Sequence, residues 1–304
     1  MKAIDIVDEG RAEMPELPIP MLRDEHVHVR VTAVPGVRCG CDHVGVVEEV
    51  GSKVTKPFRK GHRIVGFVYE AQVSFKETRQ NQSLAPSQPI SSPREMCRSS
   101  PDDVSDEKAA TPGISITTVG QGLNKSLKLP LPTEPAAERD PILSHGGSTA
   151  TGIFGIQFVK LPGLRVITTC SPHNSDYLRS LGVVIRALSD GLRREPGLGT
   201  IVPVDEEALC REHPNVRGPP LVTLGYEIFS ERCAFSWGKS PPKRDEFEFT
   251  GLSWETSRGL LARGLIRRVA PVVNRGRAGL EDALVGLEEL RNGRVSAGQL
   301  VYAL

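Results

Sequence analysis

The sequence predicts a two-domain α/β protein in which a small β-barrel is followed by a βαβ unit. Three observations support this fold class. The length of 304 residues lies at the upper edge of what one hydrophobic core organises, which favours two domains. Short strands separated by glycine turns near the start of the chain are typical of a small barrel. A strand, a helix and a second strand follow one another after residue 141.

The strands of the predicted barrel follow from the periodicity of the first part of the chain. Residues 23–34 alternate apolar and polar side chains with a period of two, as a half-buried strand does. Residues 44–50 and 63–68 are rich in β-branched side chains, and each segment is bounded by a glycine. Near the other end of the chain, a helix with leucines on one face ends at Asn292-Gly293, and a last strand covers residues 300–304.

Two segments interrupt these patterns. Residues 74–112 hold many serines, glutamines and prolines but a single phenylalanine. So few apolar groups cannot offset the entropy of ordering, so we expect a surface loop or a disordered insert. Residues 130–141 are rich in proline and mark a domain boundary.

Charge and hydropathy exclude several classes of function. The 38 basic and 37 acidic residues are spread along the chain and leave no electrostatic footprint for nucleic acid or an anionic membrane. Residues 141–159 have the length of a membrane span but contain too many polar groups to insert. Acidic residues near the N-terminus argue against a secretory signal, so we expect a cytoplasmic protein.

A glycine-rich turn is the strongest candidate for a binding site. Residues 146–151, GGSTAT, lie between the predicted strand 142–144 and the predicted helix 148–161. Bare amides and the positive helix end suit a dinucleotide pyrophosphate there. The GxGxxG spacing is absent, so a plain glycine turn remains an alternative. The next strand, 165–169, is followed by TCSPHN without an acid, which favours NADPH over NADH.

Other catalytic and metal-binding patterns are weak. Cys39, Cys41, Asp42 and His43 have side chains that bind zinc, but neighbours on a strand point to opposite faces, so at most two could converge. We therefore predict no bound zinc. The GxSxG motif fails at Ala150 and no Tyr is followed by Lys four residues later, which disfavours a serine hydrolase and a short-chain dehydrogenase.

Several segments resemble a known family. Residues 40–63 resemble the first half of the medium-chain dehydrogenase/reductase superfamily. Residues 146–182, in which GGSTAT is followed by TCSPHN, are similar to the fungal trans-acting enoyl reductases that partner polyketide synthases. Residues 224–229, LGYEIF, and the closing stretch 292–304 resemble further segments of that family. The resemblance covers roughly two thirds of the chain, in blocks.

The resemblance implies a fold and an activity. The expected fold is a GroES-like β-barrel catalytic domain, residues 1–140 and 251–304 with an insert at 74–112, plus a shortened Rossmann-type nucleotide-binding domain, residues 141–250. The expected activity is NADPH-dependent, zinc-independent reduction of an α,β-unsaturated polyketide thioester in fungal secondary metabolism. The substrate would be carried by a polyketide synthase, and we expect the protein to be a monomer.

The motifs also indicate which residues bind cofactor and substrate. The expected cofactor-binding residues are Gly147, Ser148, Thr149, Ala150, Thr151, Ser171, Pro172, His173, Asn174, Val295 and Ser296. The expected substrate-channel residues are Ile116, Thr117, Thr118, Val119, Leu123, Leu224, Gly225, Tyr226, Glu227 and Ile228.

The chain departs from the family in two ways. Between Val34 and Pro35 it lacks the Asn-Pro-x-Asp-x-Lys segment, whose lysine faces the nicotinamide in the family, so no catalytic residue is assigned. Residues 142–229 number 88, whereas a full six-stranded doubly wound sheet needs roughly 120. Two alternatives follow: a degenerate, non-catalytic member, or a quinone or alkenal reductase of the same superfamily.

Overall fold

The computed structural model divides the chain into two compact units. The first unit comprises Met1–Ile114, Phe229–Lys243 and Arg268–Leu304, and the second comprises Ser115–Ile228 and Arg244–Arg267. Within these bounds the structure describes residues 5–8, 11–16, 21–35, 42–54, 56–68, 90–93, 97–99, 104–185, 198–201, 204–212, 220–229, 233–235, 238–274, 279 and 281–304.

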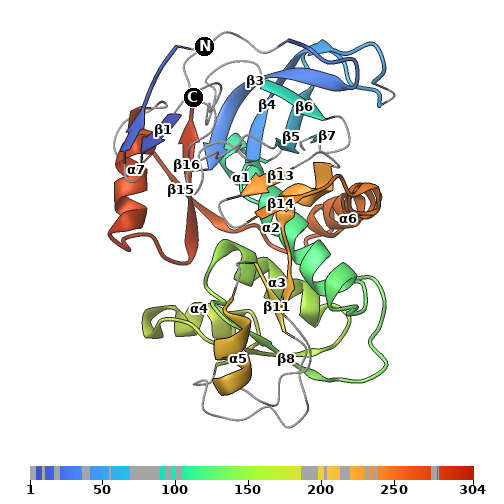
Figure 1. The fold of residues 1–304 in the computed structure, drawn as a ribbon, viewed down its shortest axis with the longest axis vertical. Coiled ribbons are helices and arrows are strands. Elements are labelled where there is room, and N and C mark those ends of the chain that lie inside the picture. Colours follow the sequence, from blue (N-terminus) through green and yellow to red (C-terminus); the bar gives the residue numbers. More distant parts are fainter. Residues whose placement is uncertain are drawn as a thin grey trace. The chain divides into compact units, whose positions relative to one another are not determined.

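A seven-stranded sheet forms the centre of the first unit (Figure 1). Its order is β15-β16-β3-β4-β5-β7, and β6 pairs with β3. All pairs are antiparallel except β15 with β16. The strands are β3 (His26–Pro35), β4 (Asp42–Val50), β5 (Arg63–Phe67), β6 (Ile90–Pro93), β7 (Cys97–Ser99), β15 (Ala270–Val273) and β16 (Gly298–Ala303). Two short antiparallel pairs are β1 (Asp5–Asp8) with β2 (Arg11–Glu13), and β13 (Cys233–Phe235) with β14 (Gly238–Ser240).

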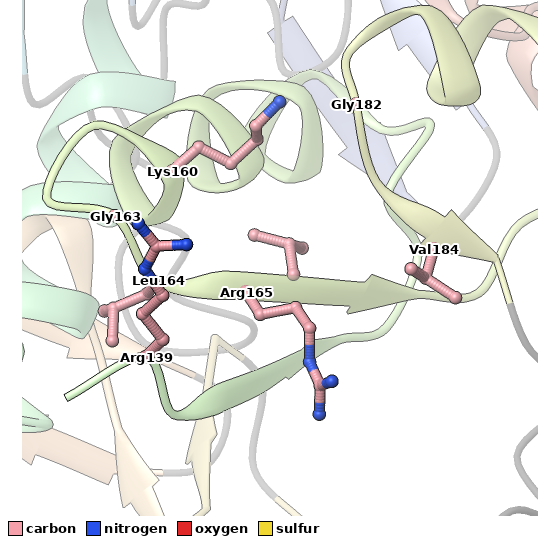
Figure 2. A pocket seen from close by; sticks show the side chains of 8 residues that line it. Arg139, Lys160, Gly163, Leu164, Arg165, Gly182 and Val184 are labelled. Atoms are coloured by element: carbon pink, nitrogen blue, oxygen red, sulfur yellow. The ribbon is translucent and has the colours of Figure 1, made fainter.

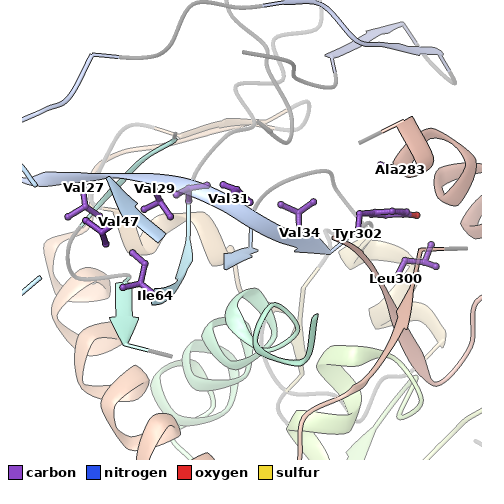
Figure 3. Packing of buried hydrophobic residues seen from close by; sticks show 10 residues of the cluster. Val27, Val29, Val31, Val34, Val47, Ile64, Ala283, Leu300 and Tyr302 are labelled. Carbon is purple, nitrogen blue, oxygen red and sulfur yellow. The ribbon is translucent and has the colours of Figure 1, made fainter. Parts of the chain in front are cut away.

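Alternation in the sequence explains the core of this sheet. Val27, Val29 and Val31 of β3 are at most 2% exposed. They pack in one cluster with Ile64 of β5 and Leu300 of β16 (Figure 3). Each such side chain contributes about 1.5–3 kcal/mol by leaving water. The strands predicted from the period of two are confirmed.

The end of the predicted insert belongs to the core of the first unit. Residues 104–112 include the short helix α1 (Asp106–Ala109), and Ala109 and Ala110 are buried against β3, β4 and β16. The Asp106 carboxylate accepts a hydrogen bond from Arg63 Nε at 2.5 Å. The expected insert therefore extends too far at this end, because two small apolar side chains and one ion pair are enough to order the segment. β6 and β7 also lie within residues 74–112, and the rest of that range is outside the described residues.

A parallel sheet organises the second unit. Its order is β10-β9-β8, with β8 (Pro141–Ser144), β9 (Arg165–Thr168) and β10 (Val184–Ile185). The helix α3 (Ala150–Lys160) connects β8 to β9, and η3 (Pro172–Asn174) and α4 (Ser175–Ser180) connect β9 to β10. Ile156, Val166 and Leu178 form the core between helices and sheet. The predicted strand–helix–strand unit is confirmed.

The remaining elements explain why the units end where they do. α2 (Gly113–Val119) runs on into the π-helix η2 (Gly120–Ser126), which packs against α6 (Arg244–Ala262). Trp254 Nε1 of α6 donates a buried hydrogen bond to Thr117 Oγ1 at 2.8 Å. The second unit therefore includes residues 115–140 and 251–267, which the sequence prediction assigns to the barrel domain.

The described strands of the second unit fall into two small sheets. Besides the three-stranded sheet, β11 (Gly199–Thr200) and β12 (Leu221–Val222) form a two-stranded parallel pair. The remaining helices are α5 (Glu206–Glu212), η4 (Gly225–Phe229) and, in the first unit, α7 (Glu281–Arg291). In the part of the chain that is described, no helix combines the length and apolar character needed to cross a membrane. The architecture agrees with the shortened nucleotide-binding domain that the sequence predicts.

Two buried titratable groups follow one another at the start of β4. Asp42 and His43 are each at most 1% exposed. Asp42 Oδ1 accepts a hydrogen bond from the amide of Ile114 at 2.6 Å, in the first turn of α2. Burial raises the pKa of the Asp42 carboxyl to about 8 and lowers the pKa of His43 to about 3. Both groups are therefore neutral in the folded protein near pH 7.

These two pKa shifts predict an unusual dependence of stability on pH. Between pH 3.8 and 6.5 the folded protein holds a proton on Asp42 that the unfolded chain lacks, and lacks a proton on His43 that the unfolded chain holds. The two differences cancel, so these groups do not change the free energy of unfolding with pH in this range. Between pH 6.5 and about 8 only Asp42 contributes, and the free energy of unfolding should fall by up to about 1.4 kcal/mol per pH unit.

Urea denaturation at a series of pH values tests this expectation. Asp42→Asn keeps an acceptor for the Ile114 amide and should remove the fall between pH 6.5 and 8. Asp24→Asn is the control, since Asp24 is an exposed carboxylate paired with Lys53 at 2.9 Å and should leave the fall unchanged. A wild-type curve that rises with pH over this window would contradict the assignment.

Candidate functional site

The turn between β8 and α3 is held by its own hydrogen bonds. Gly146 has a φ of +72°, a left-handed conformation that favours glycine. Thr149 is the N-cap of α3, and its Oγ1 accepts a hydrogen bond from the Gly152 amide at 3.0 Å. The same hydroxyl donates to the carbonyl oxygen of Gly146 at 2.9 Å. The turn thus has one defined conformation at the N-terminus of α3.

Two glycines allow this turn to lie against the sheet and the helix. A Cβ atom on Gly147 would clash with Thr168 Oγ1 of β9 and lie 3.1 Å from Ile156 Cδ1. A Cβ atom on Gly152 would clash with the Gly146 carbonyl and lie 2.8 Å from Gly147 Cα. Bare backbone is therefore required at both positions, which is the role glycines play where backbone approaches a pyrophosphate.

The amides of this turn suit an anion. Within the described chain, no hydrogen-bond acceptor is found for the amides of Ser148, Ala150 and Thr151. They lie at the N-terminus of a helix, where the first amides lack partners within the helix and the dipole favours negative charge. A diphosphate group fits this donor set. The structure therefore brings together the predicted residues Gly147, Ser148, Thr149, Ala150 and Thr151.

Thr169 joins the end of β9 to the turn. Its amide donates to the carbonyl of Ser144 at 3.2 Å, and its carbonyl accepts from the Gly147 amide at 3.0 Å. Its Oγ1 accepts from the Gly146 amide at 3.2 Å and lies 2.8 Å from His145 Nδ1. Thr169 and His145 are not among the predicted cofactor-binding residues, although the sequence carries one signal, an imidazole directly before a glycine turn.

The residues after β9 form the second part of the site. Ser171, Pro172 and His173 are exposed, and Asn174 is buried at the start of α4. Because β8 and β9 are parallel neighbours, their carboxyl ends place these residues at the same edge of the sheet as the turn. The first acid beyond them, Asp176, forms an ion pair with Arg179 at 2.8 Å. The segment 169–174 itself carries no negative charge.

The predicted substrate residues come from two segments that meet. Those on α2, together with Tyr226, Glu227 and Ile228 on η4, are buried, whereas Leu123, Leu224 and Gly225 are half-buried. The segments are adjacent because η2 packs on β12, and a Cβ atom on Gly122 would lie 3.3 Å from Thr223 Oγ1. The buried α2 residues are Ile116, Thr117, Thr118 and Val119. Their role in a substrate channel stays a prediction.

Two other predicted features belong to the first unit or lie outside the described residues. Val295 and Ser296 belong to the first unit; Val295 packs on its core and Ser296 is exposed, and a contact with the nicotinamide stays a prediction. Cys39 and Cys41 are outside the described residues. Among the residues that are described, no three His, Cys, Asp or Glu side chains form a group that could hold a metal ion.

A cavity of about 370 Å³ lies at the opposite edge of the parallel sheet (Figure 2). It is lined by Lys160 at the end of α3, by Arg165 at the start of β9, and by Arg139. Gly163, Leu164, Val166, Gly182 and Val184 complete its wall. None of the predicted cofactor residues lines this cavity, so it is separate from the glycine turn.

Known proteins similar in sequence to this chain share the name trans-enoyl reductase. No family model matches the sequence. The trans-enoyl reductase ACTTS2 of Alternaria alternata is 30% identical over 349 positions, covering 100% of this chain and 98% of that protein. The trans-enoyl reductase TOXD of Cochliobolus carbonum is 43% identical over 179 residues, covering 54% of this chain and 59% of TOXD, so this match spans only part of each protein.

Solved structures agree on the fold. The CurK enoyl reductase superposes with a TM-score of 0.72 at 13% identity, covering 99% of this chain and 98% of the other. A mycobacterial protein complexed with NADPH superposes with a TM-score of 0.68 at 19% identity, covering 100% of both chains. The chain therefore belongs to the fungal trans-enoyl reductases and has the medium-chain dehydrogenase/reductase fold.

Proposed function

We propose that the protein is an NADPH-dependent trans-acting enoyl reductase, which reduces an α,β-unsaturated polyketide thioester carried by a polyketide synthase. The observation that carries the proposal is the turn at residues 146–151, whose open amides and bare glycines fit a diphosphate. Membership in the trans-enoyl reductase family supports the reaction, and the names of the relatives support a partner that supplies the substrate.

The second unit offers a group of residues for each phosphate of NADPH. The amides of Ser148, Ala150 and Thr151 would bind the diphosphate, and the bare Gly147 lets the turn that carries them pack against β9. The polar side chains of Ser171 and His173 would face the 2′-phosphate. When bound, NADPH supplies a hydride for the β-carbon of the enoyl thioester.

The rest of the reaction needs groups that position the thioester. The negative charge that develops on the thioester oxygen needs a hydrogen-bond donor, and the α-carbon then needs a proton. In the family a lysine-bearing segment lies between the positions of Val34 and Pro35. Here these two residues are adjacent in β3 (His26–Pro35), and the segment is missing. We therefore expect slow reduction, because a misplacement of about 1 Å can cost about 100-fold in rate.

The missing lysine-bearing segment favours a second candidate function. A chain that binds NADPH without positioning the thioester would be a non-catalytic member of the family. Co-expression with the partner synthase separates the two candidates, and the saturation of the polyketide product is the readout. The proposal expects a product reduced at one double bond only when this chain is present. An unreduced product, with NADPH binding retained, would establish the non-catalytic function instead.

The end of β9 predicts a preference for NADPH over NADH. Segment 169–174 has no carboxylate to repel a 2′-phosphate, and its polar groups can donate to one, so NADPH should bind at least about tenfold more tightly. Titrating both cofactors by fluorescence measures the ratio. Ser171→Asp should reduce or reverse it by adding a negative charge, whereas Ser171→Asn should not. Tighter binding of NADH by the wild type would refute the assignment.

The packing of Gly147 predicts that a side chain at this position prevents NADPH binding. Gly147→Val should abolish NADPH binding and lower the free energy of unfolding by about 1–3 kcal/mol, because the side chain would collide with Thr168 and keep the diphosphate from the amides. Gly155→Ala is the matched control, since its Cβ would meet only Val119 Cγ2 at 3.9 Å. Unchanged affinity in a folded Gly147→Val protein would place the site elsewhere.

A further inference from the structure

His145 occupies a position beside the turn that the proposed function does not yet use. It is the residue between β8 and Gly146, and it is exposed. Its Nδ1 lies 2.8 Å from the Oγ1 of Thr169, which follows β9. The imidazole is therefore anchored at the carboxyl edge of the sheet, between the turn at 146–151 and the segment 169–174.

The contact with Thr169 uses one ring nitrogen of His145 and leaves the other open. Thr169 Oγ1 accepts the hydrogen of the Gly146 amide at 3.2 Å and keeps its own hydrogen, which it can donate to His145 Nδ1. In that tautomer the neutral ring carries its hydrogen on Nε2, and a protonated ring carries a hydrogen there as well. In both of these states Nε2 is a donor, and it has no hydrogen-bond partner among the described residues.

The surroundings of this donor select an anion. Residues 144–151 and 168–175 contain no acidic side chain that could compete for the imidazole. The turn that begins directly after His145 carries open backbone amides, those of Ser148, Ala150 and Thr151. A backbone amide set and an imidazole N–H next to one another form a site for a phosphate group.

We infer that His145 is a further cofactor-binding residue, whose Nε2 donates a hydrogen bond to the diphosphate of NADPH while Thr169 positions the ring. The inference rests on the proposed binding of NADPH. The diphosphate is favoured over the 2′-phosphate because His145 directly precedes the turn, whereas Ser171 and His173 lie on the segment that follows β9.

Binding measurements with three ligands test the inference. His145→Ala and His145→Phe should each weaken NADPH about tenfold, the effect of losing one hydrogen bond to a charged group. Phe retains a ring of similar size, so a loss of NADPH affinity in His145→Phe reports the missing N–H donor and not the packing of the ring. Both variants should weaken NADH by the same factor and leave the affinity for 2′-AMP unchanged, since 2′-AMP carries the 2′-phosphate without a diphosphate.

Thr169 supplies a second and independent readout. Thr169→Val should also weaken NADPH, and the combined Thr169→Val/His145→Phe variant should be less than about threefold worse than Thr169→Val alone, because residues in one network do not act additively. His62→Ala is the control: His62 is also exposed and its Nδ1 also accepts one hydrogen bond, from the Arg59 amide at 3.3 Å. This variant should bind NADPH as the wild type does.

Each result decides between the two proposals. NADPH affinity that is unchanged in His145→Phe, or a loss confined to NADPH and 2′-AMP, would overturn the role of His145 at the diphosphate and leave the proposed function intact. If the affinity losses of the two single variants, His145→Phe and Thr169→Val, multiply in the combined variant, the positioning role of Thr169 is overturned. A wild-type protein that binds no NADPH would contradict the proposed function, and the role of His145 with it.

Discussion

The close approach of bare backbone at Gly147 and Gly152 is the constraint on which the candidate site depends. With no Cβ atom at either position, the first turn of α3 lies directly against β9, and Thr169 can hold the turn through both its backbone and its hydroxyl. The amides at the start of α3 are then left open at the edge of the sheet. A single methyl group at Gly147 would separate the helix from the strand and disturb every one of these contacts.

Local patterns in the sequence were sufficient for the elements that carry this site. The period of two in β3 and the strand–turn–helix pattern around residues 146–151 depend on neighbouring residues, so both could be predicted. The unit boundaries could not, because they depend on contacts such as Trp254 with Thr117, which are 137 residues apart. The composition of residues 74–112 likewise gave no sign that Ala109 and Ala110 pack on the sheet. The contact of His145 with Thr169 joins two strands across 24 residues and needed the structure.

The glycine turn proposed to bind the cofactor is present in this chain, whereas the lysine-bearing segment expected from the family resemblance between Val34 and Pro35 is missing. The alignment with ACTTS2 extends over 349 positions, 45 more than the 304 residues of this chain, so this chain has gaps in that alignment. Nucleotide binding requires one well-packed edge of a parallel sheet, whereas hydride transfer requires two bound groups held within about 3.5 Å of each other. The loss of a segment therefore affects nucleotide binding less than hydride transfer.

Hydrogen exchange with and without NADPH reports on the backbone amides that would bind the diphosphate. If the turn binds the diphosphate, NADPH slows exchange in peptides that cover residues 144–152 and 169–175, and leaves peptides near Arg139 and Arg165 unchanged. Protection confined to the peptides that line the cavity at the opposite edge of the sheet, with the turn exchanging as in the free protein, would contradict it.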